Sequence, residues 1–202
     1  VPDVQIKGVG NHSACVRAFS FKDGDARLLG LIRPHKRLLD ESDAFVDRSP
    51  QKFDIHFGKE GHIYDVINGK YIGKGKTHQL DIPIATAFLF AFMPYRVTSL
   101  TADISQHGHA VTIAPVVQVS QGKPGRHVIH VRVTDVQSRR RTEYDHSIVA
   151  PNGQGAYTFN LALNDLPGRW IIQLEDVATG AAAETEIVIE PPVRARRQAW
   201  QE

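Results

Sequence analysis

Residues 69–77, Gly-Lys-Tyr-Ile-Gly-Lys-Gly-Lys-Thr, are the stretch most suggestive of chemistry. They share part of the pattern of a phosphate-binding loop, in which a glycine, four further residues and Gly-Lys-Thr cradle phosphate oxygens. The spacing does not fit, because Gly69 lies one residue too far from Gly75. Such a loop also opens a helix, whereas residues 80–83, Leu-Asp-Ile-Pro, have the pattern of a strand. We therefore interpret the glycines as part of a twisted hairpin and predict no cofactor.

Ten histidines raise the question of a metal site. His107 and His109 would lie about 7 Å apart on one side of an extended segment. Asp103 is the only nearby third ligand, and the glycine between the two histidines indicates a turn. His127 and His130 are three residues apart, so they would face opposite sides of a strand. We interpret these histidines as surface residues and predict no metal site.

Cys15 is the only cysteine, which excludes an intrachain disulfide, a disulfide-stapled scaffold and a zinc ribbon. A nucleophilic cysteine needs a paired base, and the sequence offers none, so we interpret Cys15 as a core residue. The chain has no Gly-x-Ser-x-Gly elbow, His-Glu-x-x-His helix or dinucleotide fingerprint. We predict no catalytic residue. The alternative, a hydrolase with an unrecognised active site, requires a deep pocket with convergent carboxylates or histidines.

Two tyrosines, Tyr64 and Tyr71, flank Asn68-Gly69 and are candidate carbohydrate-binding residues. Their rings could form a stacking platform for a sugar if both were exposed and coplanar. Tyrosines on paired strands also pack against their cross-strand neighbours. The sequence leaves both interpretations open.

Strand patterns recur at short spacing along the chain, with Gly, Pro and Asn between them. This pattern is typical of β-sandwiches and barrels. Asp23-Gly24, Asn68-Gly69 and Asn152-Gly153 are hairpin signals, because these residue types adopt the positive φ that tight hairpin turns need. Phe53–Phe57 and His62–Ile67 have the pattern of two strands. We predict an all-β protein made of two β-sandwich domains in tandem.

The uncharged residues 85–93 mark the end of the first predicted domain, residues 1–96. On a strand, three phenylalanines would share one face, and alanine, leucine and methionine the other. Two apolar faces indicate a strand covered on both sides. The segment is too short to cross a bilayer as a helix, which takes about 20 residues. Pro94 cannot donate to a central ladder, so the strand should end there.

Residues 97–190 contain about seven alternating segments, which is the number expected of an immunoglobulin-like β-sandwich. The lack of a disulfide excludes the antibody type but not the architecture. Trp170 lies in one of these segments, and we predict that it is a core residue. The alternation ends at residue 190, and residues 191–202, with three arginines, are predicted to form a basic tail or linker.

The net charge of +2 is too small to indicate a nucleic-acid partner or an anionic membrane surface. The chain begins with Val1 and lacks a basic-then-apolar leader. We therefore expect it to be a processed or excised piece of a longer chain.

Four stretches of the chain resemble known families. Residues 62–73, His-Ile-Tyr-Asp-Val-Ile-Asn-Gly-Lys-Tyr-Ile-Gly, and residues 87–97, Ala-Phe-Leu-Phe-Ala-Phe-Met-Pro-Tyr-Arg-Val, resemble the small β domain that closes some bacterial β-galactosidase-like glycoside hydrolase chains. Residues 124–135 and 163–180 are similar to immunoglobulin-like or macroglobulin-like modules of large bacterial multidomain proteins. These motifs consist of turns and core alternation. The catalytic residues of the hydrolase family lie on a barrel, and none can be carried over to this chain.

The resemblance implies a non-catalytic accessory or structural module of a larger bacterial protein, glycoside-hydrolase-like or a surface protein, that is exported or extracellular. The expected partners are upstream domains of the same parent chain, with carbohydrate as a further candidate. A carbohydrate-binding module is the first alternative, and a hydrolase with an unrecognised active site is the second. We expect neither nucleic acid nor a membrane as a partner.

Overall fold

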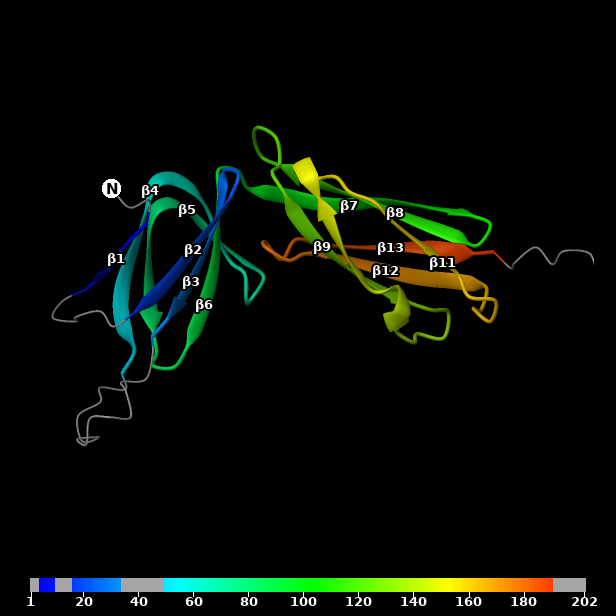
Figure 1. Ribbon diagram of the computed structural model, residues 1–202, viewed down its shortest axis with the longest axis horizontal. Coiled ribbons are helices and arrows are strands. Elements are labelled where there is room, and N and C mark those ends of the chain that lie inside the picture. The colour runs from blue at the N-terminus through cyan, green and yellow to red at the C-terminus, as the bar shows by residue number, and fades with distance from the viewer. Residues whose placement is uncertain (1–3, 10–15, 34–48, 191–202) are drawn as a thin grey trace, which may run out of the picture. The chain divides into compact units, whose positions relative to one another are not determined.

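Figure 1 shows the computed structural model, which describes residues 4–9, 16–33 and 49–190. Within these ranges the regular secondary structure consists of strands and two single-turn 3₁₀ helices, η2 (Thr142–Tyr144) and η3 (Pro151–Gly153). The predicted all-β class is confirmed. No helix in these ranges is long and apolar enough to span a membrane.

The chain divides into two compact units. Cys15 and the predicted basic tail at residues 191–202 lie outside the described residues. The first unit comprises Val1–Val97, Val119–Gly125 and Val177–Gly180, and the second comprises Thr98–Gln118, Arg126–Asp176 and Ala181–Glu202.

The first unit is built on one antiparallel sheet of six strands among the described residues. Five strands follow the order β1-β4-β6-β3-β2, and β5 pairs with β4. The strands are β1 (Gln5–Gly8), β2 (Arg17–Asp23), β3 (Ala26–Ile32), β4 (Gln51–Asp65), β5 (Lys70–Ile82) and β6 (Ala87–Met93).

β4 bends so that this one sheet encloses its own core. Residues 51–56 pair with the end of β5 and with β1, whereas residues 61–65 pair with the start of β5 and with β6. Between these halves the register with β5 shifts, and Gly58 has a φ of 72°, as in a β-bulge. Both halves face one apolar cluster, which gives a sandwich-like arrangement. The cluster contains Leu29, Leu31, Phe53, Ile55, Phe57, Ile63, Ile82, Phe90 and Phe92.

The prediction of two separate strands at Phe53–Phe57 and His62–Ile67 was therefore wrong. Both segments belong to β4 or, at its end, to the following turn. The glycines between them bend the strand, and pairing with β5 resumes at Gly61.

β6 is an inner strand of the sheet, between β3 and β4. Phe90 and Phe92 lie in the core, where the ring of Phe92 stacks on that of Phe57 with centroids 4.6 Å apart. The uncharged stretch forms a strand as predicted. The strand begins at Ala87, because Ala85 has a φ of 56°, which is not a strand conformation.

Asn68-Gly69 lies in the β4–β5 hairpin, as predicted, but the turn is not the two-residue type I′ turn. Four residues, 66–69, separate the paired residues Asp65 and Lys70. The carboxylate of Asp65 accepts hydrogen bonds from Asn68 N at 3.1 Å and from Asn68 Nδ2 at 2.7 Å. Gly69 alone of the Asn-Gly pair has a positive φ, 57°. The Asp65 side chain therefore stabilises a longer turn.

The second unit is an immunoglobulin-like sandwich of two sheets among the described residues, as predicted. One sheet has the order β10-β9-β12-β13, and the other has the order β11-β8-β7. Trp170 is fully buried, which confirms its prediction as a core residue. The strands are β7 (Val97–His107), β8 (Ala110–Val119), β9 (His127–Thr134), β10 (His146–Ala150), β11 (Tyr157–Asn160), β12 (Gly168–Asp176) and β13 (Ala182–Ile189).

Asn152-Gly153 does not form the predicted hairpin. Both residues adopt positive φ, 54° and 73°, as a type I′ turn requires. The strands on either side nevertheless pair with different neighbours, β10 with β9 and β11 with β8. The left-handed residues therefore lie in η3, where the chain crosses from one sheet to the other.

We expect Gly61→Ala to destabilise the first unit much more than Gly75→Ala, although the two glycines face each other across β4 and β5. A Cβ at Gly61 would overlap the ring of Phe92 and lie 2.8 Å from the carbonyl oxygen of Met93. A Cβ at Gly75 would lie no closer than 3.4 Å to a neighbour, the carbonyl oxygen of Thr77. Overpacking of this kind costs about 1–3 kcal/mol.

Urea unfolding of both variants, followed by circular dichroism, measures this difference. Gly75→Ala serves as the matched control, with an expected change within about 0.5 kcal/mol. Equal losses of unfolding free energy in the two variants would contradict the close packing of β4 on β6.

Candidate functional site

The structure places the two candidate carbohydrate-binding residues side by side, but with different exposure. Tyr64 on β4 is 2% exposed, and its hydroxyl accepts a hydrogen bond from Val97 N at 2.8 Å. Tyr71 on β5 is half-buried, and its ring centroid lies 5.2 Å from that of Tyr64, with the rings inclined by 55°. The pair does not present two exposed coplanar faces. Carbohydrate binding at this hairpin stays a prediction.

Tyr71 is engaged by two basic residues. Its hydroxyl lies 2.9 Å from Nδ1 of His62, and the guanidinium carbon of Arg96 lies 4.6 Å from its ring centroid. Burial lowers the pKa of His62 below its ordinary value, and the positive charges of Lys74 and Arg96 lower it further. The neutral imidazole is therefore favoured beside the Tyr71 hydroxyl, and the arginine stacks on the ring as a cation–π contact.

Residues that precede β7 are fixed by hydrogen bonds within the first unit. Arg96 O accepts a bond from Ser120 N at 2.8 Å, and Arg96 N donates to Ser120 Oγ at 3.0 Å. The hydroxyl of Tyr95 accepts a bond from Gly125 N at 2.7 Å. These hydrogen bonds hold in place the backbone that positions Arg96 beside Tyr71.

The second unit contains a buried polar cluster that the sequence analysis did not identify. We call Asp135, Arg141, Tyr144 and Asp165 the Asp165 cluster. The Tyr144 hydroxyl donates to Oδ2 of Asp165 at 2.5 Å, and Nη2 of Arg141 lies 2.5 Å from Oδ1. Ala162 N also donates to Oδ2 of Asp165 at 2.8 Å. The Asp165 carboxylate therefore faces a cation, a hydroxyl and a backbone amide.

Aromatic rings connect the Asp165 cluster to both sheets. The ring of Tyr144 stacks on that of Phe159 in β11 with centroids 4.5 Å apart, and it lies 6.0 Å from that of Trp170 in β12. The guanidinium of Arg141 lies 5.6 Å from the ring centroid of Trp170. The indole Nε1 of Trp170 donates to the carbonyl of Leu166 at 3.0 Å. The cluster thus joins the β9–β10 connection to the β11–β12 connection.

Asp135 fixes the turn that follows β9. Its Oδ1 accepts hydrogen bonds from Gln137 N at 2.9 Å and Arg139 N at 3.0 Å, and its Oδ2 accepts two from the Arg139 side chain, from Nε and Nη2. Burial of the carboxyl opposes ionisation, but these hydrogen bonds and the Arg139 charge outweigh burial and lower the pKa of Asp135. The ionised carboxylate is the form that holds the turn.

The predicted surface role of His127 was wrong. His127 and Asp176 have fully buried side chains, with Nδ1 and Oδ2 3.0 Å apart. They lie on the paired strands β9 and β12 but are 49 positions apart in the sequence. One signal could have found this position, since His127 is in phase with the core residues Ile129, Val131 and Val133.

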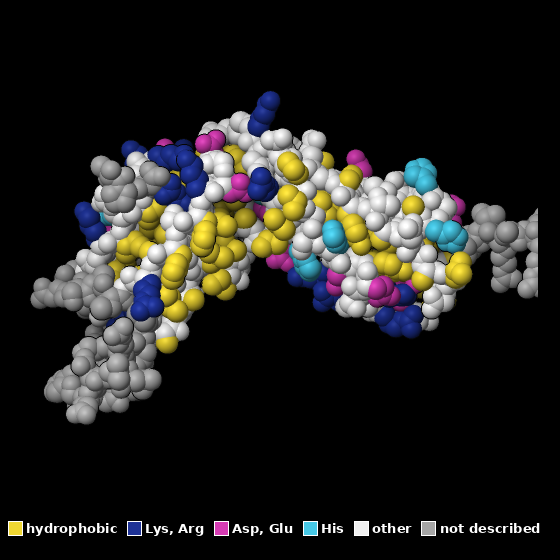
Figure 2. Space-filling model, in the orientation of Figure 1, with side chains coloured by type: hydrophobic (Ala, Val, Ile, Leu, Met, Phe, Trp, Pro, Cys, Tyr) yellow, Lys and Arg dark blue, Asp and Glu magenta, His cyan; other side chains and the backbone are white. Residues whose placement is uncertain are grey.

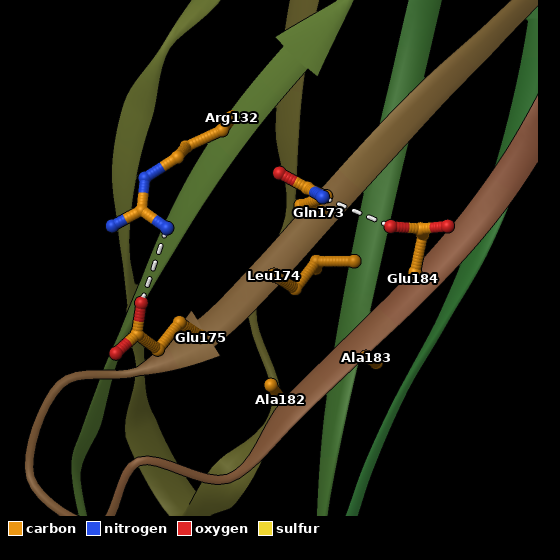
Figure 3. Close-up of a pocket in the computed structure, with 7 residues that line it drawn as sticks. All are labelled: Arg132, Gln173, Leu174, Glu175, Ala182, Ala183 and Glu184. Atoms are coloured by element: carbon orange, nitrogen blue, oxygen red, sulfur yellow. Dashed lines mark hydrogen bonds and ion pairs between the residues drawn. The ribbon is translucent and has the colours of Figure 1, made fainter. Parts of the chain in front are cut away.

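A shallow, open depression lies over β9, β12 and β13 (Figure 3). Its volume is about 310 Å³. Nη1 of Arg132 lies 3.2 Å from Glu175, and Gln173 donates to Glu184 at 2.9 Å, so its polar side chains pair with one another. All four project from neighbouring strands on the same face in Figure 3. Neither here nor elsewhere in the described ranges are three His, Cys, Asp or Glu side chains arranged to hold a metal ion.

The Tyr144 hydroxyl donates to Asp165 and also accepts a hydrogen bond from Ala162 N at 3.0 Å. We expect Tyr144→Phe to lower the free energy of unfolding of the second unit by about 1–3 kcal/mol, because both of these hydrogen bonds are lost. Urea unfolding followed by tryptophan fluorescence measures this loss, because Trp170 lies in the core beside Tyr144. Tyr157→Phe is the matched control, since the half-buried Tyr157 ring packs on His146 with centroids 4.1 Å apart. A loss no larger than that of the control would show that the Asp165 cluster does not hold the loops.

We also expect Asp135 to make stability depend on acid pH. Because the folded state lowers its pKa below the ordinary value of 3.8, the unfolded chain binds the proton more readily. The stabilisation is complete above the unfolded pKa and is lost as pH falls through the folded pKa. Asp135→Asn should lower stability at neutral pH and flatten its decline below about pH 4.

Unfolding free energies of wild type, Asp135→Asn and the exposed-site control Asp103→Asn, measured across this pH range, test the expectation. An unchanged acid slope in Asp135→Asn would argue against it.

No family model and no curated protein matches the chain. Among solved structures, the chain is similar to β-glucuronidase of Ruminococcus gnavus, with a TM-score of 0.29 and 10% identity over 94% of this chain and 45% of that chain. It is also similar to β-D-glucuronidase of Dictyoglomus thermophilum, with a TM-score of 0.28 and 6% identity over 95% and 44%. The chain spans less than half of these proteins, and scores this low carry no argument about function.

Proposed function

We propose that this chain is a non-catalytic accessory module that supports, spaces or docks other domains of a larger glycoside-hydrolase-like or surface protein. The observation that carries the proposal is the Asp165 cluster. Its carboxylates are bound by arginine, tyrosine and backbone amides that come from the loops they join. These contacts link the β9–β10 connection to the β11–β12 connection.

The arrangement of carboxylates favours a structural role over acid–base chemistry. A general acid or base must reach a substrate proton within hydrogen-bond distance. Asp135 instead accepts bonds from two backbone amides and a guanidinium, and Glu175 in the open depression pairs with Arg132. Both carboxylates are therefore already bound by groups of the same chain.

Carbohydrate binding is the second candidate function, and one observation favours it. Tyr71 keeps part of its ring exposed beside two basic residues. Tyr71, with Tyr64 behind it, would supply the aromatic surface, and Arg96 would supply hydrogen-bond donors for hydroxyl groups.

A glycan array and a panel of nitrophenyl β-glycosides, both with the 202-residue chain, test the proposal. We expect neither glycan binding nor hydrolysis, because the carboxylates and arginines described above already bind groups of the same chain. Hydrolysis by the chain would overturn the proposal in favour of an enzyme.

Tyr71→Ala and Tyr157→Ala distinguish the second candidate. Selective glycan binding that Tyr71→Ala abolishes and Tyr157→Ala retains would make the chain a carbohydrate-binding module. Tyr157 is a matched control, because it is also a half-buried strand tyrosine stacked on a histidine.

A further inference from the structure

β2 is the last strand in the order of the first unit's sheet, and it pairs only with β3 among the described strands. All seven of its residues are exposed. Phe19 and Phe21 are 53% and 64% exposed, which is unusual for phenylalanine. An exposed edge strand with large apolar side chains is a template for pairing with another chain.

The sequence of β2, Arg-Ala-Phe-Ser-Phe-Lys-Asp, is complementary to itself when it is reversed about Ser20. In an antiparallel pair of two copies centred on Ser20, Arg17 of each copy would lie opposite Asp23 of the other. Phe19 would lie opposite Phe21 of the other copy. Opposite charges and aromatic pairs directly across antiparallel strands are both stabilising.

The main-chain N–H and C=O groups of β2 alternate between the two sides of the strand in the way that this pairing requires. Asp23 and Ala26 are paired on either side of the two-residue turn Gly24–Asp25, and residues flanking such a turn exchange hydrogen bonds. Hydrogen-bonded and non-hydrogen-bonded pairs then alternate along β2 and β3. The N–H and C=O groups of Ala18, Ser20 and Lys22 consequently point to the free edge.

We propose that β2 is the interface of a two-fold symmetric dimer, in which the β2 strands of two copies pair antiparallel about Ser20. Such an interface uses the same surface on both copies. Its hydrogen-bonded pairs would be Ser20 with Ser20 of the second copy and Ala18 with Lys22. Phe19 and Phe21 would occupy non-hydrogen-bonded pairs, where side chains approach most closely.

The apolar side chains on the outer face of the sheet also favour a second copy of this chain as the partner. Phe19 and Phe21 lie beside Gly30 and Leu28 of β3, which in turn lie beside the half-buried Leu89 and the buried Ala91 of β6. Figure 2 shows hydrophobic side chains gathered over this part of the first unit. Pairing of two β2 strands would join the apolar faces of both copies into one surface and bring the four phenylalanines together at its centre.

Sedimentation equilibrium of the 202-residue chain, at low to high micromolar concentrations, tests the proposal. We expect a monomer–dimer equilibrium, with Ser20→Pro weakening the dimer by about tenfold or more, or about 1.4 kcal/mol. Proline removes an edge-facing N–H and leaves the β2–β3 hydrogen bonds in place, which edge strands tolerate. Ser20→Ala keeps the N–H and is the matched control, with an expected change of less than about twofold.

Charge exchange provides a second test that does not depend on proline. Arg17→Asp should weaken the dimer, because it would place two aspartates opposite each other. Combining Arg17→Asp with Asp23→Arg should restore the dimer, because each pair is then opposite in charge again. Val188→Ser, at an exposed position on β13, should have no effect.

Two results would overturn the proposal. One is a chain that stays monomeric at all concentrations, in which case the charged ends of β2 serve only to protect the edge. The other is a dimer that neither Ser20→Pro nor Arg17→Asp weakens, which would place the interface on another surface.

Discussion

The burial of the Asp165 carboxylate is the constraint on which the second unit depends. A buried carboxylate without partners would cost several kcal/mol of folding free energy. A cation and hydrogen-bond donors from other parts of the chain must therefore lie next to it. Arg141 and Tyr144 do so from the β9–β10 connection, and Ala162 does so from the start of the β11–β12 connection. These connections lead to strands of both sheets. The contacts of the Asp165 carboxylate therefore fix how the two sheets pack on each other. The stacked rings of Tyr144 and Phe159 then complete the apolar core at the same place.

In the first unit the corresponding constraint is geometric. A single sheet can enclose a core only if it bends, and the bend lies in β4, where the register with β5 shifts and Gly58 takes a positive φ. Gly61 then allows the ring of Phe92 and the backbone of β6 to approach β4 closely. Small residues thus set the curvature, and the large side chains of β3, β4 and β6 fill the space that results.

The sequence predicted the features that depend on alternating apolar and polar residues within a segment. It did not predict the features that depend on pairing between distant strands or on the bending of a strand. Trp170 and the second unit's sandwich follow from alternation and turn spacing. The continuity of β4 could not be predicted, because glycines signal a bulge and a turn equally well. Asn152-Gly153 has the dihedral angles of a hairpin turn, yet strand pairing elsewhere takes the chain to the other sheet. Partners such as His127 and Asp176 meet only once β9 and β12 are paired.

Polar groups have different roles in the two units. In the second unit polar side chains bind one another in the interior, whereas in the first unit main-chain polar groups line an exposed sheet edge. Inside the sandwich, buried carboxylates contact an arginine, a tyrosine hydroxyl and a histidine of the same unit. Along β2 the main-chain groups of alternate residues face outward beside two exposed phenylalanines. The exposed edge of the first sheet is therefore where contact with another chain would add hydrogen bonds and bury apolar area without changing the fold.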